Sequence, residues 1–335
     1  MDAIFLTGGT GFVGANLARL LIDKKLRVRA LARKGSSRRN LDGLDVEIIE
    51  GDLLDQDALR AGCAGARYVF HVAADYRIWV PDPSAMRQAN IQGTINVIEA
   101  AAAAGAERIV YCSSVAAIKP PSARGPVDEN SRYGGVDQVI GDYKKSKYLA
   151  ECAALDFAEK GRPVVVVNPA APIGPWDAKP TPTGRILVDF LNGRMPSYVD
   201  TGLCVVHVRD VALGHWLAAT RGRVAQRYIL GGENLTLQQI LRALAEISGR
   251  PAPRFKTPYA AAYAFAAADT ALSRLTGREP RAPLDAVRMA KYFMWYDSGK
   301  AARELGYQPV PARQALADAV AWFKANGYVR EPSAS

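Results

Sequence analysis

Tyr143 and Lys147 lie four residues apart in the segment DYKKSK, and their side chains could together transfer a proton. A free tyrosine phenol has a pKa of about 10 and is a poor base at neutral pH. A nearby ammonium group stabilises the phenolate and lowers this pKa toward the range in which enzymes work. The pair therefore predicts acid–base chemistry at an oxygen atom, and a basic amphipathic helix with an i,i+4 contact is the structural alternative.

Two adjacent serines supply a third candidate group. Ser113 and Ser114 end an apolar run that predicts a strand, and Tyr143 begins the helical pattern that follows it. In a parallel sheet with intervening helices, both segments converge on the carboxyl edge, where ligands bind. A serine hydroxyl can hold a substrate carbonyl or alcohol there. Ser114, Tyr143 and Lys147 thus predict proton transfer at an oxygen, coupled to hydride transfer at its carbon. Lys147 also has N–H donors to spare for the ribose hydroxyls of a cofactor, so we expect it to bind the cofactor as well.

The elements that would position these residues alternate through the first half of the chain. Apolar runs typical of buried strands cover residues 3–8, 27–33, 46–52, 68–74, 108–114 and 164–169. Helical patterns lie between them near 12–24, 55–62, 84–105 and 142–160. Apolar strands alternating with helices are typical of a parallel sheet covered on both faces. The sequence therefore predicts an α/β fold with a doubly wound parallel sheet of the Rossmann type.

The pattern changes after Pro169. The segment NPAAPIGPWDAKPTPTG is too rich in proline and glycine to form one regular element. The segment RYILGG resembles a late strand that returns to the sheet, and helical patterns dominate after it. We therefore expect a smaller, mostly helical substrate-binding region beside the sheet domain. The predicted boundaries are 1–169 for the sheet domain, rejoined at about 205–232, and 170–204 with 233–330 for the substrate-binding region.

A glycine-rich turn, TGGTGFVG, joins the first apolar run to the first helical pattern. Gly8, Gly11 and Gly14 stand between a strand and a helix, which is the context that a dinucleotide-binding turn requires. Gly8 permits the tight turn, Gly11 removes a side chain where a pyrophosphate approaches, and Gly14 lets helix and strand pack closely. The helix N-terminus then offers free N–H groups to the phosphates. The turn residues that we assign to cofactor binding are Gly8, Thr10, Gly11, Phe12, Val13 and Gly14.

The end of the second apolar run indicates which dinucleotide binds. Arg33 and Lys34 stand where an acidic residue would bind a ribose 2′-hydroxyl, and no carboxylate occurs between Asp23 and Asp42. Cations at this place fit a 2′-phosphate, which favours NADP(H) over NAD(H). A solvated basic loop with no cofactor contact is the alternative, and NAD stays open as the cofactor.

Several short motifs, taken together, resemble one enzyme family. They are TGGTGFVG, GDLLD, HVAA, NIQGTINVIEAA, YCSS, YKKSK and HVRDVA. Over nearly its whole length the chain resembles the extended short-chain dehydrogenases/reductases of the NAD-dependent epimerase/dehydratase type. The segments HVAADYRIW and NPAAPIGPWD are most similar to the hopanoid-associated sugar epimerases, which are relatives of dihydroflavonol 4-reductase.

The resemblance implies further site residues and an assembly. It places Asp52 and Leu53 beside the adenine, Ala73 and Ala74 along the cofactor, Asn90 behind the site, and Pro169 at the nicotinamide. It favours Ser114 over Ser113 as the catalytic serine. It also implies a homodimer in which the helices expected at 84–105 and 142–160 form a four-helix interface.

Three departures from the family pattern bear on the reaction. Val115 and Ala116 replace the Asp–Glu pair with which the family's dehydratases follow the catalytic hydroxyl, so dehydration is not expected. Pro172 stands where nucleotide-sugar epimerases usually place an asparagine, as in carbonyl reductases, and Arg33 suggests NADP(H). An NADPH-dependent carbonyl reductase is therefore the alternative to an epimerase. A non-catalytic dinucleotide sensor on the same fold is a third possibility, which the retained tyrosine–lysine pair disfavours.

Other residues are candidates for contact with a substrate or a metal. Side chains near the predicted edge that could contact substrate are Tyr76, Arg77, Trp79, Trp176 and Arg209. Packing is the alternative for Trp79, and an ion pair with Asp210 is the alternative for Arg209. The three histidines have no metal-ligand spacing, so we expect no metal and structural roles for His71, His207 and His215.

Composition excludes some classes of function. Hydrophobic residues make up 49% and charged residues 23% of the 335 residues, as in ordinary globular proteins. The net charge of +10 is spread over the chain, with no basic run interleaved with aromatics, so no nucleic-acid partner is expected. A general attraction for anionic ligands, including phosphorylated cofactors and anionic lipid, is the milder inference.

Location is indicated by cysteine usage and by apolar stretches. The four cysteines are scattered and no cationic, apolar leader precedes the first strand, which predicts a cytoplasmic protein with reduced thiols. The stretch 259–275 contains Asp269 and Arg274 and is shorter than the roughly 20 apolar residues of a spanning helix. We expect a packed helix there, with a helix lying on a membrane surface as the alternative.

Overall fold

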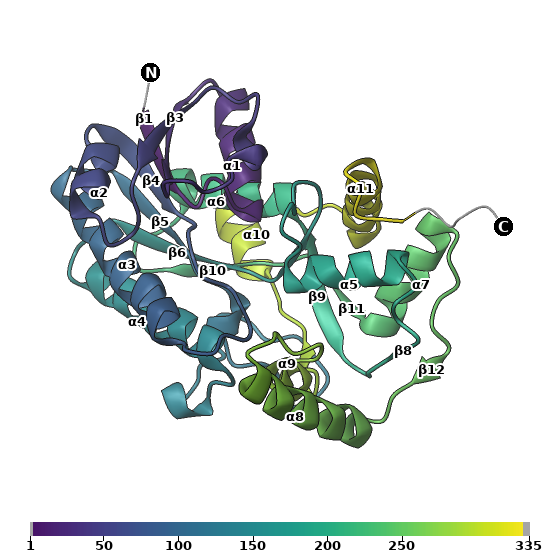
Figure 1. Ribbon diagram of the computed structural model, residues 1–335. Coiled ribbons are helices and arrows are strands. Elements are labelled where there is room, and N and C mark those ends of the chain that lie inside the picture. The colour runs from purple at the N-terminus through teal and green to yellow at the C-terminus, as the bar shows by residue number, and fades with distance from the viewer. Residues whose placement is uncertain (1–2, 331–335) are drawn as a thin grey trace.

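A seven-stranded parallel sheet forms the centre of the larger part of the molecule (Figure 1). The computed structural model describes residues 3–330. The strand order is β10-β6-β5-β4-β1-β2-β3, and every neighbouring pair is parallel. In chain order the strands are β1 (Ala3–Thr7), β2 (Arg27–Ala32), β3 (Val46–Glu50), β4 (Ala66–His71), β5 (Arg108–Cys112), β6 (Val164–Pro169) and β10 (Arg227–Leu230).

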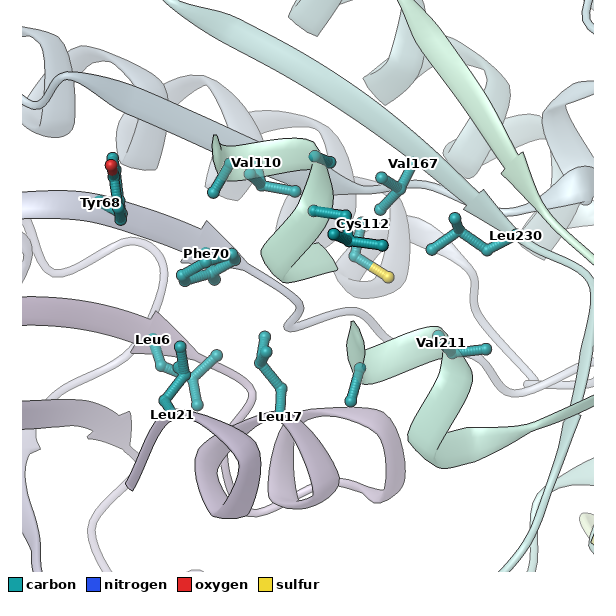
Figure 2. Packing of buried hydrophobic residues seen from close by; sticks show 14 of the residues in the cluster. Leu6, Leu17, Leu21, Tyr68, Phe70, Val110, Cys112, Val167, Val211 and Leu230 are labelled. Carbon is teal, nitrogen blue, oxygen red and sulfur yellow. The ribbon is translucent and has the colours of Figure 1, made fainter. Parts of the chain in front are cut away.

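Helices cover both faces of this sheet. On one face lie α1 (Phe12–Asp23), α6 (Val208–Arg221) and α10 (Gly299–Leu305). On the other face lie α2 (Gln56–Cys63), α3 (Ser84–Ala103) and α4 (Asp142–Glu159). Figure 2 shows the first of these layers, in which Leu17 and Leu21 of α1 point toward Leu6 and Phe70 of the sheet. The β-branched run Val164–Val167 in β6 is completely buried, as expected for a strand covered on both faces.

A smaller region lies beside the carboxyl edge of the large sheet and has its own core (Figure 1). Its four-stranded sheet consists of β7 (Ala171–Ile173), β9 (Gly202–His207), β11 (Glu233–Thr236) and β13 (Phe293–Met294). A separate pair joins β8 (Ser197–Tyr198) to β12 (Phe255–Lys256). The helices of this region are α5 (Pro182–Leu191), α7 (Leu237–Ser248), α8 (Tyr259–Thr276), α9 (Leu284–Met289) and α11 (Ala312–Ala325). Short 3-10 turns occur at η1 (Arg39–Leu41), η2 (Val115–Ala117) and η3 (Val136–Gln138).

The predicted doubly wound parallel sheet is confirmed, and the late strand Arg227–Leu230 does return to it beside β6. The smaller region also contains a sheet that we did not predict, because its strands are two to six residues long and carry little alternation. The division of the chain into two domains stays a prediction.

Helix α8 packs on the rest of the molecule through one face only. Ala266, Thr270 and Ser273 are buried, whereas Phe265 and Leu272 are more than half exposed. Among residues 3–330, no helix combines the length and the apolar character needed to cross a membrane.

Candidate functional site

The glycine turn after β1 is shaped by two close approaches. Gly8 has a φ of +75°, and a Cβ atom added to it would lie 2.5 Å from the Ala73 backbone nitrogen. A Cβ atom on Gly14 would lie 2.1 Å from the Gly8 carbonyl oxygen. Any side chain at either position would therefore push β1, α1 and the segment after β4 apart.

The N-terminus of α1 is free to receive an anion. Gly11 is the N-cap, no side chain caps the helix, and its first turn carries no acidic residue. Phe12 is buried and Val13 packs against the core, while the Thr10 carbonyl accepts a hydrogen bond from Asn40. Backbone N–H groups and the helix dipole are thus what this turn offers to a pyrophosphate.

Four cations follow β2, and two of them are already paired within the chain. Arg38 forms an ion pair with Glu50, and Arg39 donates a hydrogen bond to Asn326. Arg33 and Lys34 are exposed, and neither side chain has a polar partner within residues 3–330. A 2′-phosphate could therefore be met by Arg33 and Lys34 without breaking an existing contact.

The positions implied for the rest of a dinucleotide lie at the ends of three strands of the large sheet. Asp52 and Leu53 follow β3, and the Asp52 carboxylate accepts a hydrogen bond from the Leu54 amide at 2.7 Å. The half-buried Ala73 and Ala74 follow β4, and the buried Pro169 ends β6.

Lys147 lies beneath this edge and is almost inaccessible, with 2% of its surface exposed. Its Nζ donates hydrogen bonds to the Tyr111 hydroxyl at 2.9 Å and to the Cys112 carbonyl at 2.8 Å. Burial lowers the pKa of Lys147, while the ionisable Tyr143, Cys112 and Glu151 oppose this shift. The ammonium group is thus held in one place by two acceptors from β5.

Tyr143 lies in the first turn of α4, and its phenol lies close enough to the Ser114 hydroxyl for that group to lower the pKa of Tyr143. Burial raises the pKa of Tyr143 above its ordinary value, while the Lys147 charge and the Ser114 hydrogen bond oppose the rise. This differs from our expectation that Lys147 would bring the pKa of Tyr143 below its ordinary value, because desolvation of the phenol is the larger effect. Ser114 is half-buried and also caps η2, while Ser113 is buried.

A buried polar row behind Lys147 was not predicted. The His71 ring stacks on Tyr111 with centroids 5.5 Å apart, and it hydrogen-bonds Thr7 at 2.7 Å and Thr94 at 3.0 Å. Burial, aided by the nearby Lys147 charge, lowers the pKa of His71 to about 3, so the ring is neutral at physiological pH. Within a strand such as RIVYC, Tyr111 looks like a core aromatic, and nothing in the sequence pattern marks its hydroxyl as a partner of Lys147.

Asn90 of α3 holds the segment after β4 onto α4. Its amide accepts a hydrogen bond from the Asp75 nitrogen at 2.7 Å and donates to the Asp75 carbonyl and to the Ser146 hydroxyl, both at 2.9 Å. These contacts make Asn90 a positioning residue in this structure, and its place behind a bound cofactor stays a prediction.

A second buried network fixes Ser114 from below. Asn168 of β6 donates to the Ser114 carbonyl at 3.0 Å and to Glu151 of α4 at 2.5 Å. Glu151 in turn pairs with Arg227 of β10 at 2.7 Å, and both side chains are largely buried. The network joins β6, β10 and α4, so the serine and tyrosine segments are held in a fixed relation.

The substrate candidates after β4 lie together. Tyr76 reaches the Lys179 carbonyl at 3.4 Å, Arg77 forms an ion pair with Asp75, and Trp79 is half-buried. The hydroxyl of Tyr76 therefore joins the segment after β4 to the segment after β7, and a substrate contact by Tyr76, Arg77 or Trp79 stays a prediction.

Trp176 and Arg209 have other partners. The guanidinium carbon of Arg19 lies 3.5 Å from the centre of one Trp176 ring, and the Trp322 ring centroid lies 6.2 Å from that of Trp176. Arg209 is exposed and lies 3.9 Å from Asp318 of α11. The alternative ion pair between Arg209 and Asp210 is wrong, because Asp210 accepts a hydrogen bond from the Val310 amide instead.

The histidines and other potential metal ligands have structural surroundings. His207 caps α6 and bonds Asp318 at 3.0 Å, and His215 contacts the Val211 carbonyl at 2.7 Å. Within residues 3–330, no three or more His, Cys, Asp or Glu side chains are grouped so that they could hold a metal ion.

Comparisons with known proteins identify the family of this chain. The family model for the NAD dependent epimerase/dehydratase family matches residues 4–231. A Synechocystis protein with the provisional name dihydroflavonol 4-reductase is 48% identical over 98% of this chain and 96% of its own length. Sterol demethylase protein B of Methylococcus capsulatus is 36% identical over 97% of this chain and 99% of its own length. The crystal structure of gox2253 is 46% identical and covers 98% of this chain and 100% of that chain, with a TM-score of 0.88. The chain therefore belongs to the NAD-dependent epimerase/dehydratase family and is an NAD(P)-dependent enzyme of the extended short-chain dehydrogenase/reductase type.

Proposed function

We propose that this enzyme interconverts a carbonyl compound and a secondary alcohol with NADP(H), and that Tyr143, Lys147 and Ser114 carry the proton transfer. The observation that supports this most is the position of the Lys147 ammonium. It is buried, it lies close enough to Tyr143 to lower the pKa of that phenol, and it is held by the Tyr111 hydroxyl and the Cys112 carbonyl.

Each residue of the group has a separate task in the proposed reaction. The phenol of Tyr143 gives its proton to the carbonyl oxygen in reduction and takes it back in oxidation. Ser114 donates a hydrogen bond to the same oxygen, and Lys147 stabilises the phenolate that forms. The nicotinamide, when bound, supplies or accepts the hydride at the neighbouring carbon.

The turn and the cations after β2 fit such a cofactor. The uncapped N-terminus of α1 would hold the pyrophosphate, and Arg33 with Lys34 would meet the 2′-phosphate. The family description names NAD, which stays the alternative to NADP(H).

A reductase is better supported than an epimerase. Val115, Ala116 and Pro172 depart from the sugar-nucleotide enzymes at the places that contact their substrates, and a 48% identical relative bears a reductase name. The resemblance to the hopanoid-associated sugar epimerases supports the second candidate, an epimerase acting on a sugar.

The two reactions differ in how they treat the cofactor. A reductase exchanges its cofactor in every cycle, so NADPH should dialyse away from the purified protein and be consumed with ketone substrates. An epimerase returns the hydride to the same molecule, so nicotinamide fluorescence should survive dialysis, and sugar substrates should give no net oxidation of NADPH. Retained cofactor together with epimerised sugar would overturn the reductase.

We also infer that the enzyme is a homodimer through α3 and α4. These helices pack side by side on the outer face of the sheet, and Leu149 on α4 is 37% exposed. Light scattering of the purified protein should give twice the chain mass, and a monomer would contradict this assembly.

A further inference from the structure

Helix α8 carries a continuous apolar face toward solvent. Six of the nine large hydrophobic side chains that are exposed within residues 3–330 lie between 255 and 275. Leu275 is 86% exposed, Leu272 58% and Phe265 56%. Single exposed apolar residues are ordinary, but five of these six lie on α8 itself, and such a concentration on one helix marks a surface that binds something.

The spacing of these residues places them on one side of the helix. Residues 261, 265, 268, 272 and 275 follow each other at intervals of three or four, and the exposed alanines 260, 264 and 271 lie between them. We call this set the apolar face, and it consists of Ala260, Ala261, Ala264, Phe265, Ala268, Ala271, Leu272 and Leu275. It contains no charged or hydrogen-bonding side chain.

The opposite side of α8 anchors it to the protein. Thr270 accepts a hydrogen bond from the Leu284 amide and Asp269 accepts one from the Ala282 amide, both at 3.0 Å. α9 packs against α8 on this side, and α8 lies along the outer edge of the molecule (Figure 1). The helix is thus fixed without any contribution from its apolar face.

The segment around α8 is strongly basic. Residues 250–291 contain eight lysines and arginines and three acidic residues, which gives +5, half of the net charge of the whole chain. Arg274, Arg278 and Arg281 are exposed and have no ion-pair partner within residues 3–330. The three acidic residues are already engaged, since Asp269 holds Ala282, Glu279 lies 3.5 Å from Arg185, and Asp285 lies 3.5 Å from Arg288.

We propose that the apolar face and its basic border dock α8 on the surface of an anionic lipid bilayer. Such a bilayer binds helices of this kind, because the apolar side can enter the headgroup region and the bordering cations attract anionic lipids. A second copy of the chain is a poor partner for the apolar face, because two segments 250–291, each with a net charge of +5, would repel each other. The helix lies on the bilayer and does not cross it.

Helix α9 connects α8 to the candidate site. Asp285 of α9 packs on Gly141, so that a Cβ atom on Gly141 would lie 3.0 Å from its carboxylate, and Gly141 precedes Tyr143 by two residues. Docking through α8 would therefore hold the candidate site near the bilayer, with α9 between α8 and the segment that carries Tyr143. This consequence for the candidate site rests on the proposed function. Docking itself does not, because vesicle binding is measured without any enzymatic reaction.

Sedimentation of the full chain with vesicles tests the docking. The wild-type protein should sediment with vesicles of phosphatidylcholine and phosphatidylglycerol and not with phosphatidylcholine alone. The triple variant Phe265→Gln/Leu272→Gln/Leu275→Gln should lose at least about tenfold in partition coefficient. Since each cation near the surface contributes about 1 kcal/mol, removing three of them should cost on the order of 100-fold.

Matched variants separate docking from general attraction of a basic protein. Arg274→Gln/Arg278→Gln/Arg281→Gln removes three cations from the border, and Lys119→Gln/Arg162→Gln/Lys324→Gln removes three exposed cations elsewhere. Only the first should lose binding, and circular dichroism should show that all variants are folded. Equal losses in both, no binding of the wild type, or a dimer that the apolar-face variant dissociates would each overturn the proposal.

Discussion

The candidate site and the apolar face of α8 differ in how they break the rule that polar groups are exposed and apolar groups are buried. At the site, the Lys147 ammonium is buried and donates hydrogen bonds to two fixed acceptors. On α8, Leu275 is exposed and nothing within the described residues covers it. A charge inside and an apolar face outside both cost stability, so each marks a place where the chain serves something other than folding.

The largest effect should come from removing the buried charge. Lys147→Met keeps the length of the side chain but leaves no ammonium to stabilise the Tyr143 phenolate, so kcat with a ketone substrate should fall by about 10³-fold. Vesicle binding should not change, because α8 is untouched. A Lys147→Met variant with the wild-type melting temperature and the wild-type kcat would contradict the catalytic role of Lys147.

The next effect should be on cofactor choice. Arg33→Ala removes a cation whose side chain has no polar partner within residues 3–330. The loss of its charge-assisted hydrogen bond to the 2′-phosphate should weaken NADPH binding by roughly 10- to 100-fold. NADH binding, which needs no cation at this place, should stay as it is. Arg39→Ala, whose partner is Asn326, is the control, and isothermal titration measures all three proteins. Equal losses for NADPH and NADH would show that Arg33 does not read the 2′-phosphate.

A smaller effect on kcat should follow from removing one of the two hydrogen-bond acceptors of Lys147. Tyr111→Phe removes one of the two acceptors of the Nζ atom while keeping the ring on which His71 stacks. The ammonium loses a favourable contact, so the pKa of Lys147 should fall further and kcat should drop by about tenfold. The pH profile of kcat should shift with it, which a purely structural role of Tyr111 would not cause.

The smallest effect concerns stability at mildly acid pH. Burial lowers the pKa of His215 to about 4, so the folded state binds fewer protons than the unfolded state between that value and about 6.5. Stability due to this group is present above pH 6.5 and is lost as the pH falls, by about 1 kcal/mol between pH 6.5 and 5.5. Burial raises the pKa of Asp177 to about 6, so this group stabilises the folded state as the pH falls, opposite to His215. The contribution of His215 must therefore be measured as the difference between the wild type and a variant without this histidine.

Urea unfolding at the two pH values supplies that difference. Between pH 6.5 and 5.5, the free energy of unfolding of His215→Leu should fall by about 1 kcal/mol less than that of the wild type. The apolar-face variant of α8 should behave as the wild type, because it removes no buried titratable group. An unchanged pH dependence in His215→Leu would show that His215 does not stay neutral in the folded protein.

The large sheet could be predicted because its strands carry long apolar runs and its turns carry glycines. Gly14 contacts only backbone of the same turn, so the spacing of the glycines indicated its place, whereas the approach of Gly8 to Ala73 joins residues 65 apart. The contact between Tyr111 and Lys147 joins residues 36 apart, and a strand tyrosine with a buried hydroxyl looks the same as one that only packs.

The surroundings of α8 and of Arg209 could not be predicted for a different reason. The Ala-rich stretch has few polar residues, so its pattern does not show which side faces the core, and only the fold does so. Asp318, which pairs with Arg209, lies on α11 more than a hundred residues away, and no local spacing connects the two.

Tyr143→Phe tests the central claim most directly. The substitution removes one oxygen and leaves the glycine turn, Arg33 and Lys147 in place. We predict that NADPH binds to this variant with nearly the wild-type dissociation constant, while reduction of a ketone substrate falls by about 10³-fold at every pH. Wild-type turnover in a variant that binds NADPH would contradict the account, because the proton would then come from another group.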